Sequence, residues 1–264
     1  MTAANTTRLV QFFRDAASGS RALTRNAVVL LALFAFCLLL SFIDDRLFNG
    51  INTWHKPAKF FLSIAVLFTT VAWALSLVAP NLRQRRSIRW SIVALLSASW
   101  LELAYITFRA TRAEGSHFNV DTPLENALYS IMGLGAVTMT TTTAIIGFII
   151  WRNRNGDIWR EAAGLGLVLG AVLGTLTASV LATGTSHWIG GDQTDATSLP
   201  LFYWSTTGGD LRVAHFIGLH AMQAVPFAAL SGRRSVVYAV AMALTLFTAA
   251  AFAQGMLGIP LFKA

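Results

Sequence analysis

Charged side chains and cysteine are scarce in this chain. Asp, Glu, Lys and Arg make up 12% of its 264 residues, against about 25% in an ordinary soluble domain. The hydrophobic fraction is 55% and the mean hydropathy is +0.59, which indicates a polytopic membrane protein rather than one large soluble core. A single cysteine, Cys37, excludes an internal disulfide and matches no metal-ligand spacing.

Several functional signatures are also missing. The sequence contains no Walker loop, no Gly-rich dinucleotide turn and no Ser-nucleophile elbow in the required strand–turn–helix context. The last apolar run, 235–257, has no lysine, which excludes a retinal Schiff base of the rhodopsin kind. The net charge of +8 sits in short segments between apolar runs, so we expect no nucleic-acid partner.

Seven apolar runs are about long enough to cross a bilayer as helices. We therefore expect an all-α polytopic membrane protein, a bundle of seven transmembrane helices, with residues 1–26 as a cytoplasmic segment and 27–264 as one transmembrane domain. The expected spans are 27–43, 58–79, 88–108, 124–150, 161–183, 211–230 and 235–257.

Basic residues alternate between the loops and predict the orientation of the bundle. The N-terminal segment and the loops around residues 80–89, 151–160 and 231–234 hold 13 of the 20 Lys and Arg residues. The opposite side holds 7, together with nine of the twelve acidic residues. By the positive-inside rule we expect a cytoplasmic N-terminus and an outer C-terminus, in the inner membrane of a bacterium.

Residues that favour helix ends and kinks occur at the expected positions. Thr122-Pro123-Leu124-Glu125 is typical of a capping box at the start of the fourth span. Asp210 is expected to cap the sixth span, and Gly232 to close it. Pro226, inside the sixth span, is expected to kink it.

All five histidines fall on the predicted outer side. Histidine ligates metals and carries protons near neutral pH, so this one-sided set is the main functional clue. The candidate metal ligands are His55, His117, His187, His215 and His220.

A polar stripe accompanies the histidines on the third span. Glu102 is expected to lie about 9 Å below the outer end of that helix, where a carboxylate is costly without a partner or a proton. Tyr105, Arg109 and Arg112 follow at helical spacing on the same face. Glu102 and Tyr105 are the candidate catalytic residues, and a structural Glu–Arg or Glu–His pair is the alternative.

The sixth span carries two of the histidines five residues apart. His215 and His220 therefore lie about 140° apart on a regular helix and can serve one site only if the helix is distorted. Gln223 lies between them in angle. We expect His220 to reach the depth of Glu102 and to contact it.

Three functions are compatible with these residues. The first is an oxidoreductase holding haem or a transition metal, because membrane haems take axial imidazoles from facing spans. The cofactor or a quinone would then meet the remaining polar candidates, which are Arg109, Arg112, Arg212 and Gln223.

The second function is a zinc-dependent hydrolase of outer-leaflet lipid, with Glu102 as base. Seven spans with a His/acid set resemble the ceramidase and adiponectin-receptor group. That group carries a His pair four apart in its last span, and 235–257 has no histidine, so no residue role is transferred. The third is a metal-free proton-coupled transporter or receptor, with Glu102 and the histidines as protonatable groups.

Two further features concern partners and access. Gly166, Gly170 and Gly174 form a ridge of small residues suited to close helix contact, within the bundle or across a homodimer. The long segment 184–210, rich in Gly, Thr, Ser and Asp, is either a lid over the outer face or a connector.

Overall fold

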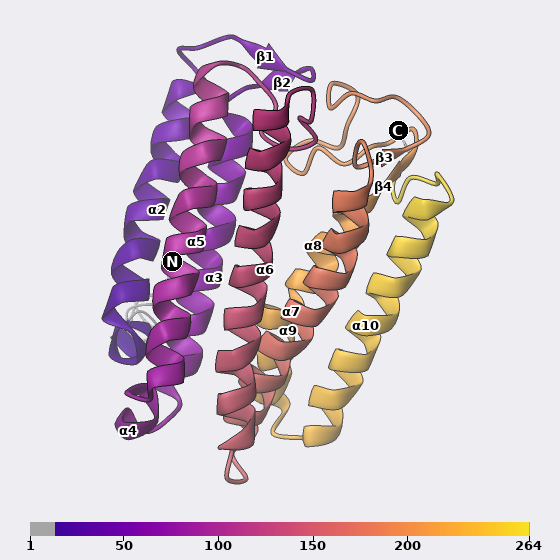
Figure 1. Cartoon of the computed structure of the whole chain (residues 1–264). Coiled ribbons are helices and arrows are strands. Elements are labelled where there is room, and N and C mark those ends of the chain that lie inside the picture. The colour runs from indigo at the N-terminus through magenta and orange to yellow at the C-terminus, as the bar shows by residue number, and fades with distance from the viewer. Residues whose placement is uncertain (1–13, 264) are drawn as a thin grey trace, which may run out of the picture.

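The computed structural model describes residues 14–263 as an all-helical bundle (Figure 1). Six helices are long and apolar enough to cross a membrane, and a bent pair makes a seventh span if it is counted as one. The expected membrane-protein fold is confirmed at this level. The six long helices are α2 (Arg21–Leu40), α3 (His55–Ser76), α5 (Arg86–Thr111), α6 (Pro123–Arg152), α7 (Ile158–Thr183) and α10 (Arg234–Met256).

The bent pair consists of α8 (Leu211–Leu219) and α9 (Ala221–Phe227), which the short 3-10 helix η1 (Ala228–Ser231) extends. The two parts meet at 42°. We had expected the distortion at Pro226, but the bend lies six residues earlier, at His220. At the bend, the Phe216 carbonyl accepts two hydrogen bonds from His220. One comes from the backbone N–H at 3.1 Å and the other from the ring Nδ1 at 2.8 Å.

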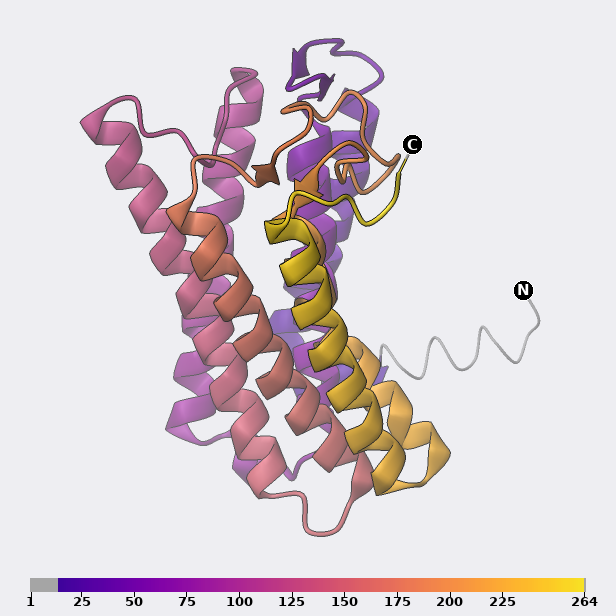
Figure 2. The ribbon, with the colours of Figure 1, turned by 90° about the vertical axis from the view of Figure 1, so that its right-hand side faces the viewer.

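The bundle has two chemically different ends. The short helix α4 (Pro80–Arg83), the 153–157 turn and η1 lie at one end, called here the arginine end. The strands β1 (Leu47–Phe48), β2 (Ile51–Asn52), β3 (Trp188–Ile189) and β4 (Gly209–Asp210) lie at the other, called the histidine end (Figures 1 and 2).

Capping side chains begin the helices where the sequence indicates. The Thr122 hydroxyl accepts a hydrogen bond from the Glu125 backbone N–H at 3.2 Å, and the Glu125 carboxylate accepts one from the same hydroxyl. Asp210 caps α8 by accepting from the Arg212 N–H at 3.0 Å. Gly232 ends η1 with φ of +67°, a left-handed conformation that suits glycine. The caps expected at Thr122, Asp210 and Gly232 are confirmed, except that the Glu125 carboxylate takes the Thr122 hydroxyl as its donor in place of the backbone N–H of a capping box.

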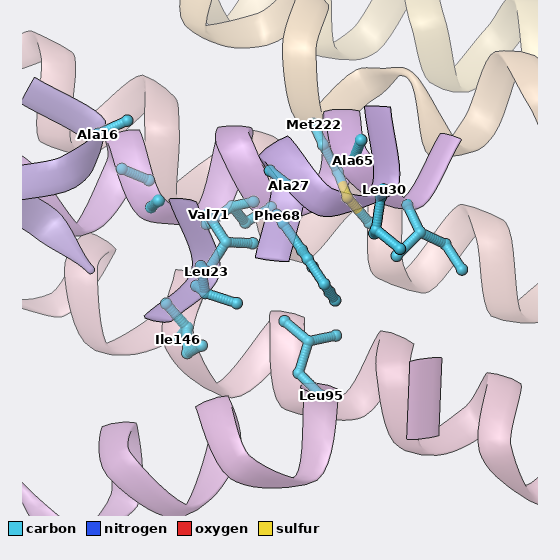
Figure 3. Packing of buried hydrophobic residues seen from close by; sticks show 14 of the residues in the cluster. Ala16, Leu23, Ala27, Leu30, Ala65, Phe68, Val71, Leu95, Ile146 and Met222 are labelled. Atoms are coloured by element: carbon cyan, nitrogen blue, oxygen red, sulfur yellow. The ribbon is translucent and has the colours of Figure 1, made fainter. Parts of the chain in front are cut away.

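The apolar core lies where α2 and α3 meet α5 and α6. Figure 3 shows Phe68 and Val71 of α3 between Leu23 of α2, Leu95 of α5 and Ile146 of α6. All five side chains are fully buried. The residues on the other faces of these helices are largely exposed, as expected where lipid covers a bundle.

The second half of the bundle packs through the glycine ridge. A methyl group added at Gly166 would meet Pro226 and Ala221, and one added at Gly170 would meet Met222 and Leu219. The ridge is thus filled by α8 and α9 of the same chain, which is the first of the two arrangements that the sequence allowed. This close contact fixes the bent pair against α7.

Two small two-stranded sheets shape the histidine end. β1 and β2 are joined by Asn49-Gly50, both with positive φ, a turn that Asn-Gly sequences favour. The Asn49 carbonyl accepts hydrogen bonds from Asp195 N–H at 2.9 Å and from the Thr194 hydroxyl at 3.1 Å. β3 pairs with β4, and so ties segment 184–210 to the start of α8. The segment is therefore anchored across the end of the bundle.

The packing predicts that Gly170→Ala destabilises the protein, because the new methyl group must displace Met222 and approach the Leu219 carbonyl at 2.9 Å. Overpacking of this kind costs about 1–3 kcal/mol, and the apparent melting temperature in detergent should fall. Gly133→Ala is the matched control, since nothing lies within 4 Å of its added methyl group. Equal stability of the two variants would contradict the assigned helix contact.

Candidate functional site

Polar side chains gather at the histidine end in an otherwise apolar bundle. They come from the start of α3, the middle of α5, the α5–α6 loop, the segment 184–210 and the start of α8. We call this group the polar cluster; its members are His55, Lys56, Lys59, Glu102, His117, His187, Asp195, Tyr203, Asp210 and Arg212.

The deepest part of the polar cluster is a row of three residues. Glu102 lies nine residues before the end of α5, about 14 Å along the helix axis. Its Oε1 is 3.5 Å from Nε2 of His117. Nδ1 of His117 is 3.3 Å from the Lys56 ammonium, which can only donate. The ring proton of His117 is therefore assigned to Nε2, facing Glu102.

The second oxygen of Glu102 lacks a partner. The side chain is 4% exposed, and Oε2 is buried with no hydrogen bond to any of residues 14–263. It faces α6 at Gly135, where an added methyl group would lie 3.5 Å from it. A buried carboxylate oxygen without a donor favours a bound proton. Glu102 is thus suited to take up and release a proton, with His117 beside it.

A hollow on the surface of the histidine end reaches this row. It has a volume of about 460 Å³ and is lined by His117 and Phe118, among others. Arg109, Glu114 and Glu125 line it as well, so its walls are strongly polar. His117 lines the hollow and also contacts Glu102, so it connects the two.

The rest of the predicted stripe on α5 serves the α5–α6 loop. Arg109 is buried, donates to the Gly115 carbonyl at 2.8 Å and pairs with Glu114 at 3.0 Å and Glu125 at 3.4 Å. Arg112 pairs with Glu114 at 3.0 Å. Tyr105 is partly buried and has no hydrogen bond among the described residues. The two arginines therefore hold the loop that carries His117.

On the other side of the polar cluster, Arg212 organises the segment 184–210. It donates to Asp210 at 2.7 Å, to Asp195 at 3.0 Å and to the Tyr203 carbonyl. His187 approaches the same Asp195 at 4.0 Å but forms no hydrogen bond through Nε2, which is buried. Arg212 thus has its charge balanced by two carboxylates.

Tyr203 covers the first turn of α3. Its hydroxyl is hydrogen-bonded to Nδ1 of His55 at 2.7 Å, the two rings stack at 5.6 Å, and the Lys59 ammonium lies 4.4 Å from the Tyr203 ring centroid. Tyr203 and nearby Leu201 have φ of +58° and +74°, a conformation that costs a bulky residue about 1–3 kcal/mol. The surrounding contacts hold the loop in this strained form.

Burial keeps the loop histidines neutral. The pKa of His117 is lowered well below its usual value, first by burial and then by the positive charge of Lys56. The pKa of His187 is also strongly lowered, by burial and then by Arg212 and the two lysines of α3. Both rings are therefore uncharged near neutral pH, and act as donors and acceptors rather than as cations.

The α8 and α9 residues belong to a different environment. His215 Nδ1 is 3.1 Å from the Gly174 carbonyl and 3.0 Å from the Thr177 hydroxyl of α7. Gln223 donates to the Thr70 hydroxyl at 2.9 Å and so joins α9 to α3. The contact that we expected between His220 and Glu102 is not formed; the partner of Glu102 is His117, because the His220 ring turns back to its own helix.

The five histidines are divided between these environments rather than gathered around one point. Among residues 14–263, no three His, Cys, Asp or Glu side chains are grouped as a metal site requires. Four of the rings have Nδ1 in a polar contact with the protein. In His117 the other ring nitrogen, Nε2, faces Glu102, whereas in His55, His215 and His220 it is the atom able to meet a ligand.

Sequence reasoning missed Lys56, Lys59 and Tyr203 as members of the site. The two lysines were detectable, because they occupy the first turns of an apolar helix at the end of the bundle that has fewer basic residues. Tyr203 was not, since its role follows from a loop conformation that brings it back to α3.

No protein-family model, no curated protein and no solved structure matches the chain.

The neutral state of His187 predicts a loss of stability in acid. Unfolded histidine titrates near pH 6.5, and the folded pKa lies below that value, so unfolding takes up a proton as the pH falls below 6.5. The cost for one such ring reaches about 1 kcal/mol at pH 5.5. The apparent melting temperature should therefore fall between pH 7.5 and 5.5, and fall less in His187→Gln. Arg112→Gln is the control, and an undiminished fall in His187→Gln would refute this assignment.

Proposed function

We propose that the protein spans the inner membrane of a bacterium with its N-terminus in the cytoplasm and the histidine end outside. The support is the distribution of basic residues: 13 of 20 belong to the N-terminal segment and the loops of the arginine end. In this orientation the hollow and segment 184–210 face the outer solution.

Within that orientation, the proposed function is proton-coupled transport without a metal. The observation that carries it is the contact of Glu102 with His117, 3.5 Å apart, with the second carboxylate oxygen buried and unpartnered. A carboxyl group that is costly to ionise and next to an imidazole is the chemistry of a proton site in a transporter.

The proton reaches Glu102 from the outer solution through His117. A hydronium ion in the hollow gives its proton to Nδ1 of His117 and becomes water, as the Lys56 ammonium turns away from that atom, and Nε2 passes its own proton to Oε1 of Glu102. The ring is neutral before and after the transfer, so no charge is left on it. Release toward the cytoplasm requires a second conformation in which Glu102 meets the other side of the bundle.

The test is proton uptake into proteoliposomes filled with a pH-sensitive dye. Acetate, benzoate, phosphate, alanine or glucose is added outside, and the internal pH is followed. Protein-free liposomes are measured in parallel, and their signal is subtracted, because undissociated acetic and benzoic acid cross a bilayer unaided. Above that background, the wild type is expected to acidify the interior with at least one of these solutes, and Glu102→Gln is expected to abolish that coupling because it has no proton to exchange.

Asp121→Asn is the control, because Asp121 is an exposed carboxylate lining the same hollow. It should behave as the wild type. Solute-driven acidification that persists in Glu102→Gln, or its absence from the wild type with the whole panel, overturns the proposed transport.

One observation favours a second candidate, a haem or transition-metal oxidoreductase. His220 lies at the break between α8 and α9 and His215 lies five residues before it, and each has Nδ1 hydrogen-bonded to a backbone carbonyl. Anchoring of one ring nitrogen leaves the other, Nε2, available to a metal, as in many metalloproteins. No such observation favours the zinc hydrolase, which needs three converging ligands.

An absorption spectrum of the detergent-purified protein, oxidised and then reduced with dithionite, separates the two candidates. Bound haem would give a Soret band and reduced α and β bands that are lost in His215→Ala or His220→Ala. On the transport proposal the wild type is colourless, and elemental analysis of the same sample finds no stoichiometric transition metal. A haem spectrum would replace that proposal by the oxidoreductase.

A further inference from the structure

We propose that Lys56 and Lys59 form the binding site for a small carboxylate monoanion, covered by Tyr203. This inference rests on the proposed function and assigns its substrate class. The site lies on the first two turns of α3, next to the Glu102–His117 pair.

The charge of the two lysines is not balanced by a direct partner. Among the described residues, no carboxylate lies within 4 Å of either ammonium group, whereas Arg212 pairs with both Asp195 and Asp210. Lys56 contacts an imidazole and Lys59 lies over an aromatic ring. Two partly buried cations that lack anions, one turn apart on the same helix, present donors for the two oxygens of one carboxylate.

Other groups in the polar cluster also lack partners. Nε2 of His187 and Nε1 of Trp188 are buried without hydrogen bonds to any described residue, and Trp188 is 8% exposed. The two rings are in contact, with centroids 4.0 Å apart, and the Arg212 guanidinium lies over Trp188 at 5.9 Å. Buried polar atoms without a hydrogen-bond partner are rare in native proteins, and a bound ligand or water is one way to satisfy them.

Tyr203 is placed to act as the cover. Its ring makes a cation–π contact with the Lys59 ammonium, and its hydroxyl is hydrogen-bonded to Nδ1 of His55. Tyr203 and Leu201 have strained, positive φ angles, so the loop relieves this backbone strain when these contacts are released. A carboxylate that takes the place of the aromatic ring on Lys59 exchanges a cation–π contact for an ion pair. The apolar part of the solute would then meet the rings next to the two lysines: His55 stacks on Tyr203 beside Lys59, and Phe60 contacts the His117 ring beside Lys56.

Charge balance links this anion to the proton on Glu102. With Glu102 ionised, the three cations Lys56, Lys59 and Arg212 are matched by Glu102, Asp195 and Asp210. Protonation of Glu102 leaves one positive charge in excess, which one monoanion neutralises. Because the site is partly buried, the anion and the proton each favour the binding of the other.

The groups that face Glu102 are few, so this link is specific to it. They are His117 from the α5–α6 loop, Lys56 from α3 and the glycine backbone of α6 at Gly135. Tyr129 of α6 lies against the His117 ring. Of these, His117 is held neutral by burial and Lys56 keeps its charge up to pH 7, so Glu102 is the group whose charge changes between pH 5.5 and pH 7.

The experiment is equilibrium binding of radiolabelled acetate and benzoate to the detergent-purified full chain, at pH 5.5 and pH 7, a range in which both lysines stay charged. Removing a charged hydrogen-bond partner costs about 1.5–3 kcal/mol, so Lys59→Gln should weaken binding about tenfold or more. Lys59→Arg should restore much of it, which separates loss of charge from loss of fold. Lys263→Gln is the matched control, because Lys263 is the only other lysine and lies at the far end of the chain.

The pH dependence tests the link to Glu102. Wild-type binding should be tighter at pH 5.5 than at pH 7, while Glu102→Gln, which copies the protonated carboxyl group, should bind equally well at both. Absence of carboxylate binding to the wild type, wild-type affinity in Lys59→Gln, or an unchanged pH dependence in Glu102→Gln each overturns the inference.

These outcomes are separable from those of the proposed function. Proton uptake that depends on Glu102 but is driven by glucose or alanine alone, with no carboxylate bound, removes the anion site and leaves transport in place. Carboxylate binding that follows the lysines, without proton uptake by proteoliposomes, supports the site and removes transport.

Discussion

A carboxylate about 14 Å along the axis of an apolar helix is the constraint on which the histidine end depends. Placing such a group at the centre of a membrane helix costs about 3 kcal/mol even on insertion scales. The bundle offsets this cost by bringing a loop imidazole and a lysine of another helix to Glu102, and by keeping α6 bare at Gly135. The loop in turn needs the Arg109 ion pairs to hold its position. One unfavourable burial thus dictates the contacts of three helices.

The two halves of the bundle contribute differently to this arrangement. The first four long helices supply a conventional core around Phe68, and the row from Lys56 to Glu102 lies at one end of it. The second half packs through glycines of α7 against a bent pair. Close helix contact leaves no room for side chains along the glycine ridge, so the polar groups of this half gather at its ends: at segment 184–210 and around the buried Glu161 at the arginine end, with His220 at the break between them. That segment returns to the first half through Asn49 and His55.

The sequence predicted the elements whose cause is local. The spans follow from hydropathy, the caps at Thr122 and Asp210 from side chains next to the backbone they bond, and the glycine ridge from spacing. Prediction failed where the cause is non-local. Glu102 meets His117 instead of His220, because a loop held by Arg109 comes closer than the sixth span does. No helical wheel contains that information, since it depends on how one loop folds over the end of a helix.

The same reasoning explains why counting histidines is a weaker guide than following their ring nitrogens. A histidine whose Nδ1 is bonded to a carbonyl carries its proton there and offers a lone pair at Nε2, as His215 and His220 do. A histidine whose Nδ1 accepts from lysine carries its proton on Nε2 and offers it to a carboxylate, as His117 does. Residues that look alike in the sequence therefore differ in chemistry. The two proposed uses, proton exchange at the third span and ligation at the sixth, differ in the partner of Nδ1.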